Sequence, residues 1–316
     1  MQNQRVHVLV VAYPAQGHLN PLIQFAKRLA SKGVKATVAA TPYTINSIHP
    51  NSITVEPISD GFDEGGFKQA PSVEAYLESF KTVGSRTLAE LIAKFNNSGE
   101  PVSCVVYDSL LFWAVDVAKE FGIRAAMMLT NSASVCSLYW QINQGRLALP
   151  LDQETLAASV PGLPSLSFSD MPSFLAHPTS QSAYLALIMD KIRTLGRNDW
   201  VFCNSFEELE SELVKALKEL WPVITIGPLV PSFYLDHQIE GDTRVRAKKD
   251  EEGIVRREEL GKCLREVMVG EKTREIKSSA SKWREHAKTA VSVGGSSDRN
   301  IDEFIRKLLT AKEKKA

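Results

Sequence analysis

The sequence has 316 residues, long enough for two domains or for one large domain with an appendage. With 44% hydrophobic and 23% charged residues, its composition is that of an ordinary globular protein and excludes a disordered or fibrous chain. Lysine plus arginine equals aspartate plus glutamate at 37 each, so no net charge would attract the chain to nucleic acid or to an anionic membrane. No apolar run approaches the ~20 residues of a membrane span, and we expect a cytoplasmic protein.

Strand-like and helix-like segments alternate along the first 230 or so residues. Continuous apolar runs predict strands that are buried on both faces, at Val6–Tyr13, Val34–Ala40, Ile53–Ile58, Val102–Tyr107, Arg124–Leu129, Trp200–Asn204 and Val223–Ile226. Helical periodicity predicts helices at Leu19–Leu29, Val73–Phe95, Trp113–Phe121, Ser134–Leu147, Tyr184–Leu195 and Phe206–Leu220. Segments 59–72 and 149–178 carry no such signal and are expected to be loops. This order predicts an α/β fold: a Rossmann-like parallel sheet with helices on both faces.

Two side chains at the carboxyl ends of predicted strands are candidates for a functional site, because ligands of such sheets bind at that edge. His18 follows the first strand and Asp108 ends the fourth. His18 could be a turn residue bonded to the backbone, or a base that takes a proton from a hydroxyl near neutral pH. Asp108 could cap the following helix, or accept a hydrogen bond from His18 and fix its tautomer. Gly17 beside His18 would let the backbone approach a ligand closely.

Several other site classes have no signature in this sequence. The first turn reads AQGHLN rather than G-x-G-x-x-G, which argues against a dinucleotide-dependent oxidoreductase. There is no G-x-S-x-G nucleophile elbow and no phosphate-binding P-loop. The four cysteines are Cys104, Cys136, Cys203 and Cys263, and three of them lie in apolar segments, so we expect buried reduced thiols. The cysteines are far apart in the sequence, and no metal-binding spacing such as C-x-x-C is present.

Four stretches together resemble the plant family of UDP-sugar-dependent glycosyltransferases. They read PAQGHLNPLIQFAKRL from residue 14, VVYDSLLFWAVDVAKEFGI from 105, VFCNSFEELE from 201 and TIGPLVPSFYLD from 225. The family has the GT-B fold of two facing Rossmann-like domains, and the resemblance covers its N-terminal half to about Asp242. The resemblance therefore implies that this chain is the acceptor-binding half of such an enzyme.

By this resemblance His18 would be the general base that deprotonates the acceptor, and Asp108 would orient it. The acceptor would be a small lipophilic molecule, glucosylated on a hydroxyl or carboxyl in one inverting step that uses a UDP-sugar co-substrate and neither a metal nor a cofactor. The candidate acceptor contacts either follow a strand end or carry an aromatic ring that could line a lipophilic pocket. They are Gly17, Phe112, Thr130, Tyr139 and Trp140. The aromatic members are equally interpretable as core residues.

The family's donor-binding box, which contains H-C-G-W-N-S, is absent from this sequence. We therefore expect an acceptor-binding domain at 1–242, a seam at 243–250 where the donor domain is missing, and a helical tail at 251–316. The tail is expected to contain an apolar stripe from Leu260 to Met268, a helix at Ile276–Ala290 and a helix at Ser297–Leu309, capped by Ser297 or Asp298. The last helix would pack back on the first domain. We expect an acceptor-binding monomer without sugar transfer of its own, and leave open residual or complemented transfer and self-association through uncovered tail helices.

Overall fold

A computed structural model of the chain describes residues 6–48, 52–149, 151, 163, 166–176, 182–230, 257–270 and 273–313. The expected seam at 243–250 and most of the predicted loop at 149–178 lie outside these residues. Within the described residues, no helix is both long enough and apolar enough to cross a bilayer.

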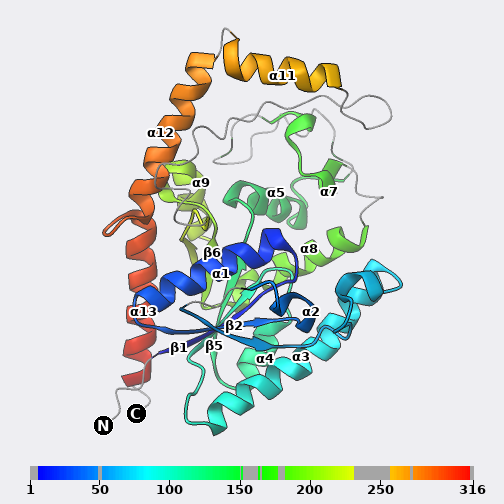
Figure 1. The fold of residues 1–316 in the computed structure, drawn as a ribbon, viewed down its shortest axis with the longest axis vertical. Coiled ribbons are helices and arrows are strands. Elements are labelled where there is room, and N and C mark those ends of the chain that lie inside the picture. The colour runs from blue at the N-terminus through cyan, green and yellow to red at the C-terminus, as the bar shows by residue number, and fades with distance from the viewer. Residues whose placement is uncertain are drawn as a thin grey trace.

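A parallel seven-stranded sheet forms the centre of the protein (Figure 1). Its strands are β1 (His7–Val11), β2 (Lys35–Ala40), β3 (Thr54–Pro57), β4 (Cys104–Asp108), β5 (Arg124–Leu129), β6 (Trp200–Cys203) and β7 (Val223–Thr225). They pair in the order β3-β2-β1-β4-β5-β6-β7. From β1 the chain adds β2 and β3 on one side of the sheet, and then returns to pair β4 with the other side of β1. The strand order therefore reverses between β1 and β4, and parallel sheets bind their ligands in the crevice at such a point.

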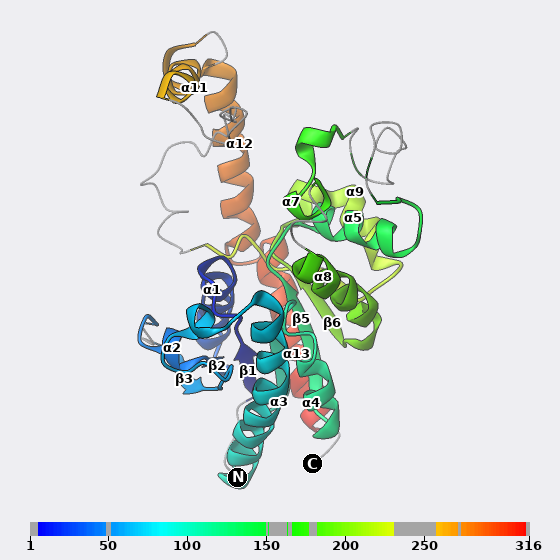
Figure 2. The same ribbon diagram turned by 90° about the vertical axis from the view of Figure 1, so that its right-hand side faces the viewer.

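Helices connect the strands and cover both faces of the sheet, as predicted (Figures 1 and 2). They are α1 (Gln16–Ser31), α2 (Pro42–Ile45), α3 (Val73–Asn97), α4 (Ala114–Glu120), α5 (Ala133–Asn143), α7 (Ser173–Ala176), α8 (Ser182–Thr194), α9 (Glu207–Lys218), α11 (Arg257–Val269), α12 (Thr273–Val291) and α13 (Ser296–Glu313). Three short 3-10 helices lie at Gly66–Gln69, Phe168–Asp170 and Leu195–Arg197. The predicted α/β fold class is therefore confirmed.

The strand pleat divides the core into two apolar clusters, because successive side chains point to opposite faces. Leu9 and Val11 of β1 belong to the cluster beneath α3, α4, α5, α8 and α9. Val8 and Val10 belong to the cluster beneath α1 and α13. Both faces of β1 are thus buried, which is why its sequence is continuously apolar.

The predicted elements differ from the observed ones mainly at their ends. The helix expected over Ser134–Leu147 ends at Asn143. The expected loop at 59–72 contains a 3-10 turn at 66–69, and the described part of the expected loop at 149–178 contains helical turns at 168–170 and 173–176. A short helix at 42–45, between β2 and β3, was not predicted. Gly33 has a φ of 83° and ends α1, as its position predicted. The predicted caps of the last helix are wrong, because α13 begins at Ser296 and both Ser297 and Asp298 lie inside its first turn.

Helix α13 packs across the sheet beside α1. Phe304 is fully buried and its ring meets Trp200 and Phe202 edge-on, with centroids 4.9 and 5.0 Å away. Lys32, directly after α1, pairs with Asp298 of α13 at 2.7 Å. The C-terminal helix is therefore part of the sheet's core rather than a loose appendage.

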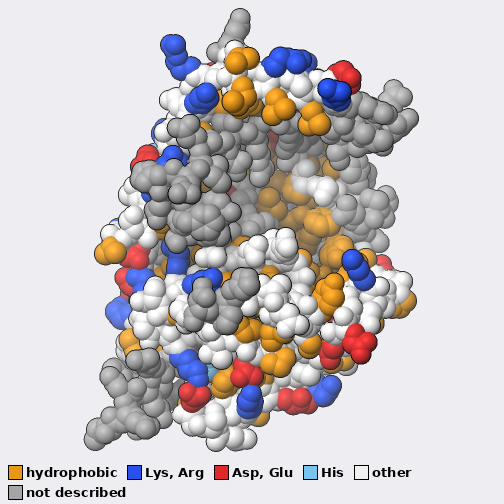
Figure 3. Space-filling model, viewed as in Figure 1, with side chains coloured by type: hydrophobic (Ala, Val, Ile, Leu, Met, Phe, Trp, Pro, Cys, Tyr) orange, Lys and Arg blue, Asp and Glu red, His pale blue; other side chains and the backbone are white. Residues whose placement is uncertain are grey.

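Helices α11 and α12 stand away from the sheet (Figure 2). Hydrophobic side chains gather along α11 at the top of Figure 3, and the largest exposed ones there are Leu260, Leu264, Met268 and Val269. In α12 only Ala290 is buried. The same view shows a hollow beneath α11, at the level of α5 and α7, with hydrophobic side chains on its floor.

Candidate active site

His18 and Asp108 meet at the crevice where the strand order reverses. Asp108 is the last residue of β4 and is fully buried, and His18 is the third residue of α1, which follows β1. Their side chains lie 2.8 Å apart, Nδ1 of His18 to Oδ2 of Asp108. The pairing of β1 with β4 brings together two residues that are 90 positions apart in the chain.

The contacts of Asp108 determine which nitrogen of His18 carries the proton. The Leu110 amide donates to Oδ1 at 2.9 Å, and Oδ2 is left to accept from His18. Since a carboxylate only accepts, Nδ1 donates and Nε2 presents its lone pair. Thr130 Oγ1, after β5, lies 3.3 Å from the same Nδ1. No hydrogen bond joins Nε2 to any residue in the described part of the chain, so a ligand can reach it.

The alternative that Asp108 caps a helix does not hold. Helix α4 begins at Ala114 with Trp113 at its N-cap, five residues beyond Asp108. The carboxylate instead binds a turn amide and the imidazole. Likewise His18 is not a turn residue held through its ring by the backbone, since its ring bonds are to side chains.

A cavity of about 520 Å³ opens beside His18. It lies between the strand ends and helices α5, α7 and α8, and its wall combines aromatic rings with a few polar groups, among them Tyr13, His18, Thr130, Tyr139, Tyr184 and Lys191. The ring of Tyr13 meets His18 edge-on at 5.5 Å. A mostly apolar wall with convergent polar groups is the usual form of a small-molecule site.

The Tyr13 and Tyr139 phenols of this wall stay protonated at neutral pH. Burial, reinforced by neighbouring Tyr184, Asp108 and Asp60, raises the pKa of Tyr13. Burial raises the pKa of Tyr139 to about 12. Neither phenol therefore supplies a base near pH 7, and His18 is the wall residue suited to that task. Among the described side chains, no group of three or more potential ligands is placed to bind a metal ion.

Comparison with known proteins places this geometry in a family. The profile described as "Glycosyltransferase, N-terminal domain" matches residues 4–52. UDP-glycosyltransferase 74F2 of Arabidopsis thaliana is 43% identical over 248 residues, which are 77% of this chain and 53% of that protein. The structure of Os79 from O. sativa in complex with UDP superposes with a TM-score of 0.87 at 25% identity, covering 95% of this chain and 100% of the other. This chain belongs to the plant UDP-glycosyltransferase family.

The chain spans about half the length of several relatives in this family. A longer alignment joins it to UDP-glycosyltransferase 74E2 of Arabidopsis thaliana, at 28% identity over 445 residues that cover 95% of this chain and 98% of the relative. Since 445 exceeds the 316 residues of this chain, the relative fills positions in that alignment for which this chain has no counterpart.

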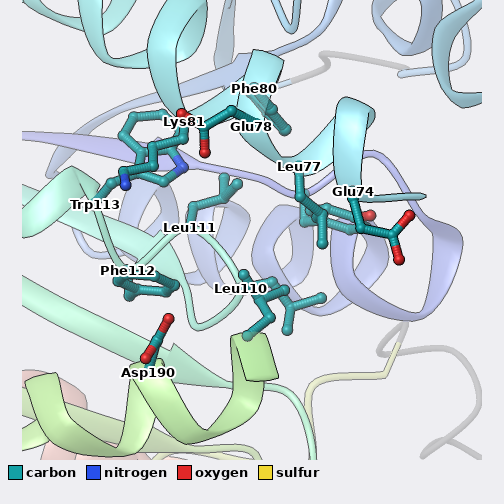
Figure 4. A pocket seen from close by; sticks show the side chains of 12 residues that line it. Glu74, Leu77, Glu78, Phe80, Lys81, Leu110, Leu111, Phe112, Trp113 and Asp190 are labelled. Atoms are coloured by element: carbon teal, nitrogen blue, oxygen red, sulfur yellow. The ribbon is translucent and has the colours of Figure 1, made fainter. Parts of the chain in front are cut away.

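The structure brings together some of the predicted site residues of this family member and separates others. His18, Thr130 and Tyr139 line the large cavity, and Asp108 lies behind His18. Gly17 is exposed at the start of α1 and is not on the cavity wall. Phe112 lines a second, smaller cavity of about 150 Å³ instead, shown in Figure 4.

Trp140 is the other predicted contact that the structure does not place on the large cavity. Its ring packs edge-on against Trp221 with a centroid distance of 4.7 Å. The sequence could not separate it from its neighbour Tyr139, because both lie on α5 and a rotation of about 100° per residue decides which of them faces the ligand.

Sequence reasoning missed Tyr13, Tyr184 and Lys191. A signal for Lys191 was available, because it continues the apolar stripe of α8 at helical spacing from Tyr184 and Ile188. A lysine in such a stripe is unusual, since lysine is seldom fully buried without a partner.

Proposed function

We propose that this chain binds a small lipophilic acceptor in the large cavity and holds its hydroxyl against His18. The observation that carries this proposal is the pair of His18 and Asp108 at the cavity wall, with Nε2 free of protein partners among the described residues. The aromatic wall formed by Tyr13, Tyr139 and Tyr184 would bury a planar apolar acceptor.

The chemistry proposed for the site is proton abstraction coupled to sugar transfer. Nε2 of His18 takes the acceptor's hydroxyl proton while the hydroxyl oxygen attacks the anomeric carbon of a UDP-sugar. The bond from that carbon to the UDP oxygen breaks, and UDP leaves with the electron pair. Asp108 keeps the base in the correct tautomer and stabilises the imidazolium that forms. Attack opposite the leaving group inverts the anomeric configuration.

We further propose that the UDP-sugar is not held by this chain. The donor box expected from the family is absent from the sequence, and the alignment with UDP-glycosyltransferase 74E2 contains positions that only the relative fills. In this view residues 1–242 form the acceptor domain, the seam lies at 243–250 and residues 251–316 form the tail. Holding two reactants in the correct relative position lowers the activation free energy of such a step by about 7 to 11 kcal/mol. A chain that does not bind the UDP-sugar would therefore transfer sugar poorly.

Titration calorimetry with 2-naphthol and with UDP-glucose, together with chromatography of the mixture, tests both parts. We expect heat of binding for 2-naphthol, none for UDP-glucose and no naphthyl glucoside. Binding of UDP-glucose with formation of the glucoside would refute the missing donor site and support residual transfer. Failure of 2-naphthol to bind would refute the acceptor cavity. If glucoside does form, His18→Ala must abolish it for the proposed base to stand.

A further inference from the structure

A buried lysine faces the cavity without a carboxylate to balance it. Lys191 lies in the last turn of α8 and is only 3% exposed. Its Nζ donates to Ser109 Oγ at a long 3.4 Å and lies 5.9 Å from the centre of the Tyr139 ring. No ion pair joins it to any acidic residue in the described parts of the chain. An ammonium has three donors, and these contacts occupy them weakly.

This arrangement is unfavourable for the protein alone. Burial lowers the pKa of Lys191, because removing an ammonium from water disfavours its charged form. The groups whose charges act on it are Cys136 of α5, Asp108 of β4 and Cys203 of β6. Asp108 is already engaged by His18 and the Leu110 amide. The described residues therefore provide no anion in direct contact with the Lys191 ammonium.

A ligand can supply that anion, because Lys191 lines the same cavity as His18. An acceptor carboxylate is already deprotonated at neutral pH and needs no base, whereas a hydroxyl does. The two groups of the site therefore suit two different groups of one molecule. The carboxylate fits the buried ammonium, and the hydroxyl fits the lone pair on Nε2.

We propose that Lys191 is a carboxylate-binding subsite, and that the preferred acceptor is a lipophilic hydroxy acid whose carboxylate pairs with Lys191 while its hydroxyl faces His18. This inference rests on the proposed acceptor cavity and specifies the class of molecule that fills it. The cavity of about 520 Å³ is large enough for an aromatic scaffold between the two groups.

Calorimetry of the full chain at pH 7 with a matched pair of ligands tests the subsite. The pair is 6-hydroxy-2-naphthoate and its methyl ester, which differ in charge but share the ring and the hydroxyl. We expect the acid to bind about tenfold or more tightly than the ester, as a charge-assisted hydrogen bond in a buried site should give. In Lys191→Met the acid should lose that advantage while the ester keeps its affinity. Lys81→Met is the control, because Lys81 lines the smaller cavity and not the large one, and its loss should leave the acid's preference intact.

The outcomes separate the subsite from the cavity. Equal affinity of acid and ester in the unmodified chain overturns the subsite and leaves the cavity supported. Equal loss of both ligands in Lys191→Met, with a folded far-ultraviolet spectrum, means that the lysine acts structurally and also overturns it. If neither ligand binds the unmodified chain, the acceptor cavity and the subsite both fall.

Discussion

Replacing Asp108 by asparagine changes the protonation of His18 while leaving its position almost unaltered. Asp108 has two oxygens in use, one for the Leu110 amide at 2.9 Å and one for His18 Nδ1 at 2.8 Å. Asparagine has a single oxygen. If that oxygen stays with the Leu110 amide, the NH₂ group faces His18 Nδ1, which must then accept, and the imidazole proton moves to Nε2.

The opposite orientation of the new amide is disfavoured. It would place the NH₂ group against the Leu110 N–H and leave buried donors unsatisfied, which costs about 1 to 3 kcal/mol. That difference favours the tautomer with the proton on Nε2 by roughly 5- to 150-fold. In Asp108→Asn the lone pair that should take the acceptor's proton is therefore replaced by a donor.

Nitrogen-15 NMR of the histidine rings reads the tautomer directly and needs no turnover. We expect Nδ1 of His18 to carry the proton in the unmodified chain and Nε2 to carry it in Asp108→Asn. His7 is an internal control, because its ring is held by Glu100 O and Thr37 Oγ1, away from the substitution. In any preparation that transfers sugar, the rate should fall by about 10⁴-fold. An unchanged His18 tautomer, or full turnover in the variant, would refute the reasoning.

Three further predictions concern packing and burial. Phe304→Ala should lower the free energy of unfolding, measured by urea titration, by about 3 to 5 kcal/mol, because the Phe304 ring is fully buried. Leu309→Ala is the control: Leu309 lies on the same helix but is 45% exposed, so the change should be less than about 0.5 kcal/mol. Equal effects of the two substitutions would mean that α13 is not part of the core. Lys191→Met should raise the free energy of unfolding at pH 7 by about 1 to 4 kcal/mol. Because burial lowers the pKa of Lys191, this lysine loses its proton at a lower pH in the folded protein than in the unfolded chain, where lysine titrates near pH 10.4. The stability gained by Lys191→Met should therefore shrink as the pH rises from 7 to 10. A gain that stays constant over this range would contradict a buried ammonium. Trp140→Phe should leave the affinity for 2-naphthol unchanged in calorimetry, since Trp140 packs on Trp221; a large loss would place Trp140 at the ligand.

In the tail, the local sequence pattern predicts where the helices form, and the tertiary environment decides which of their faces are buried. The helical segments of the tail follow from apolar residues at helical spacing, and the structure has helices there. The burial of those faces does not follow from the spacing. The stripe of α13 is buried against Phe25 and Phe202, because α13 packs on the sheet. Leu264 and Met268 of α11 remain exposed, because α11 contacts α12 rather than the sheet.

The sequence by itself determined the parallel sheet, the positions of His18 and Asp108 at its carboxyl edge, and the family. Apolar runs and helical periodicity are local properties, and a motif is read directly from neighbouring residues. Only the tertiary structure decided which side chains meet around the cavity. Lys191 and Ser109 are 82 positions apart in the chain. Phe112, in the turn before α4, lines the smaller cavity, and Trp140 packs on Trp221, because the rotation of α5 and the path of that turn are set by packing across the sheet. That packing left a buried ammonium facing the cavity, which no local pattern could place beside the proposed base.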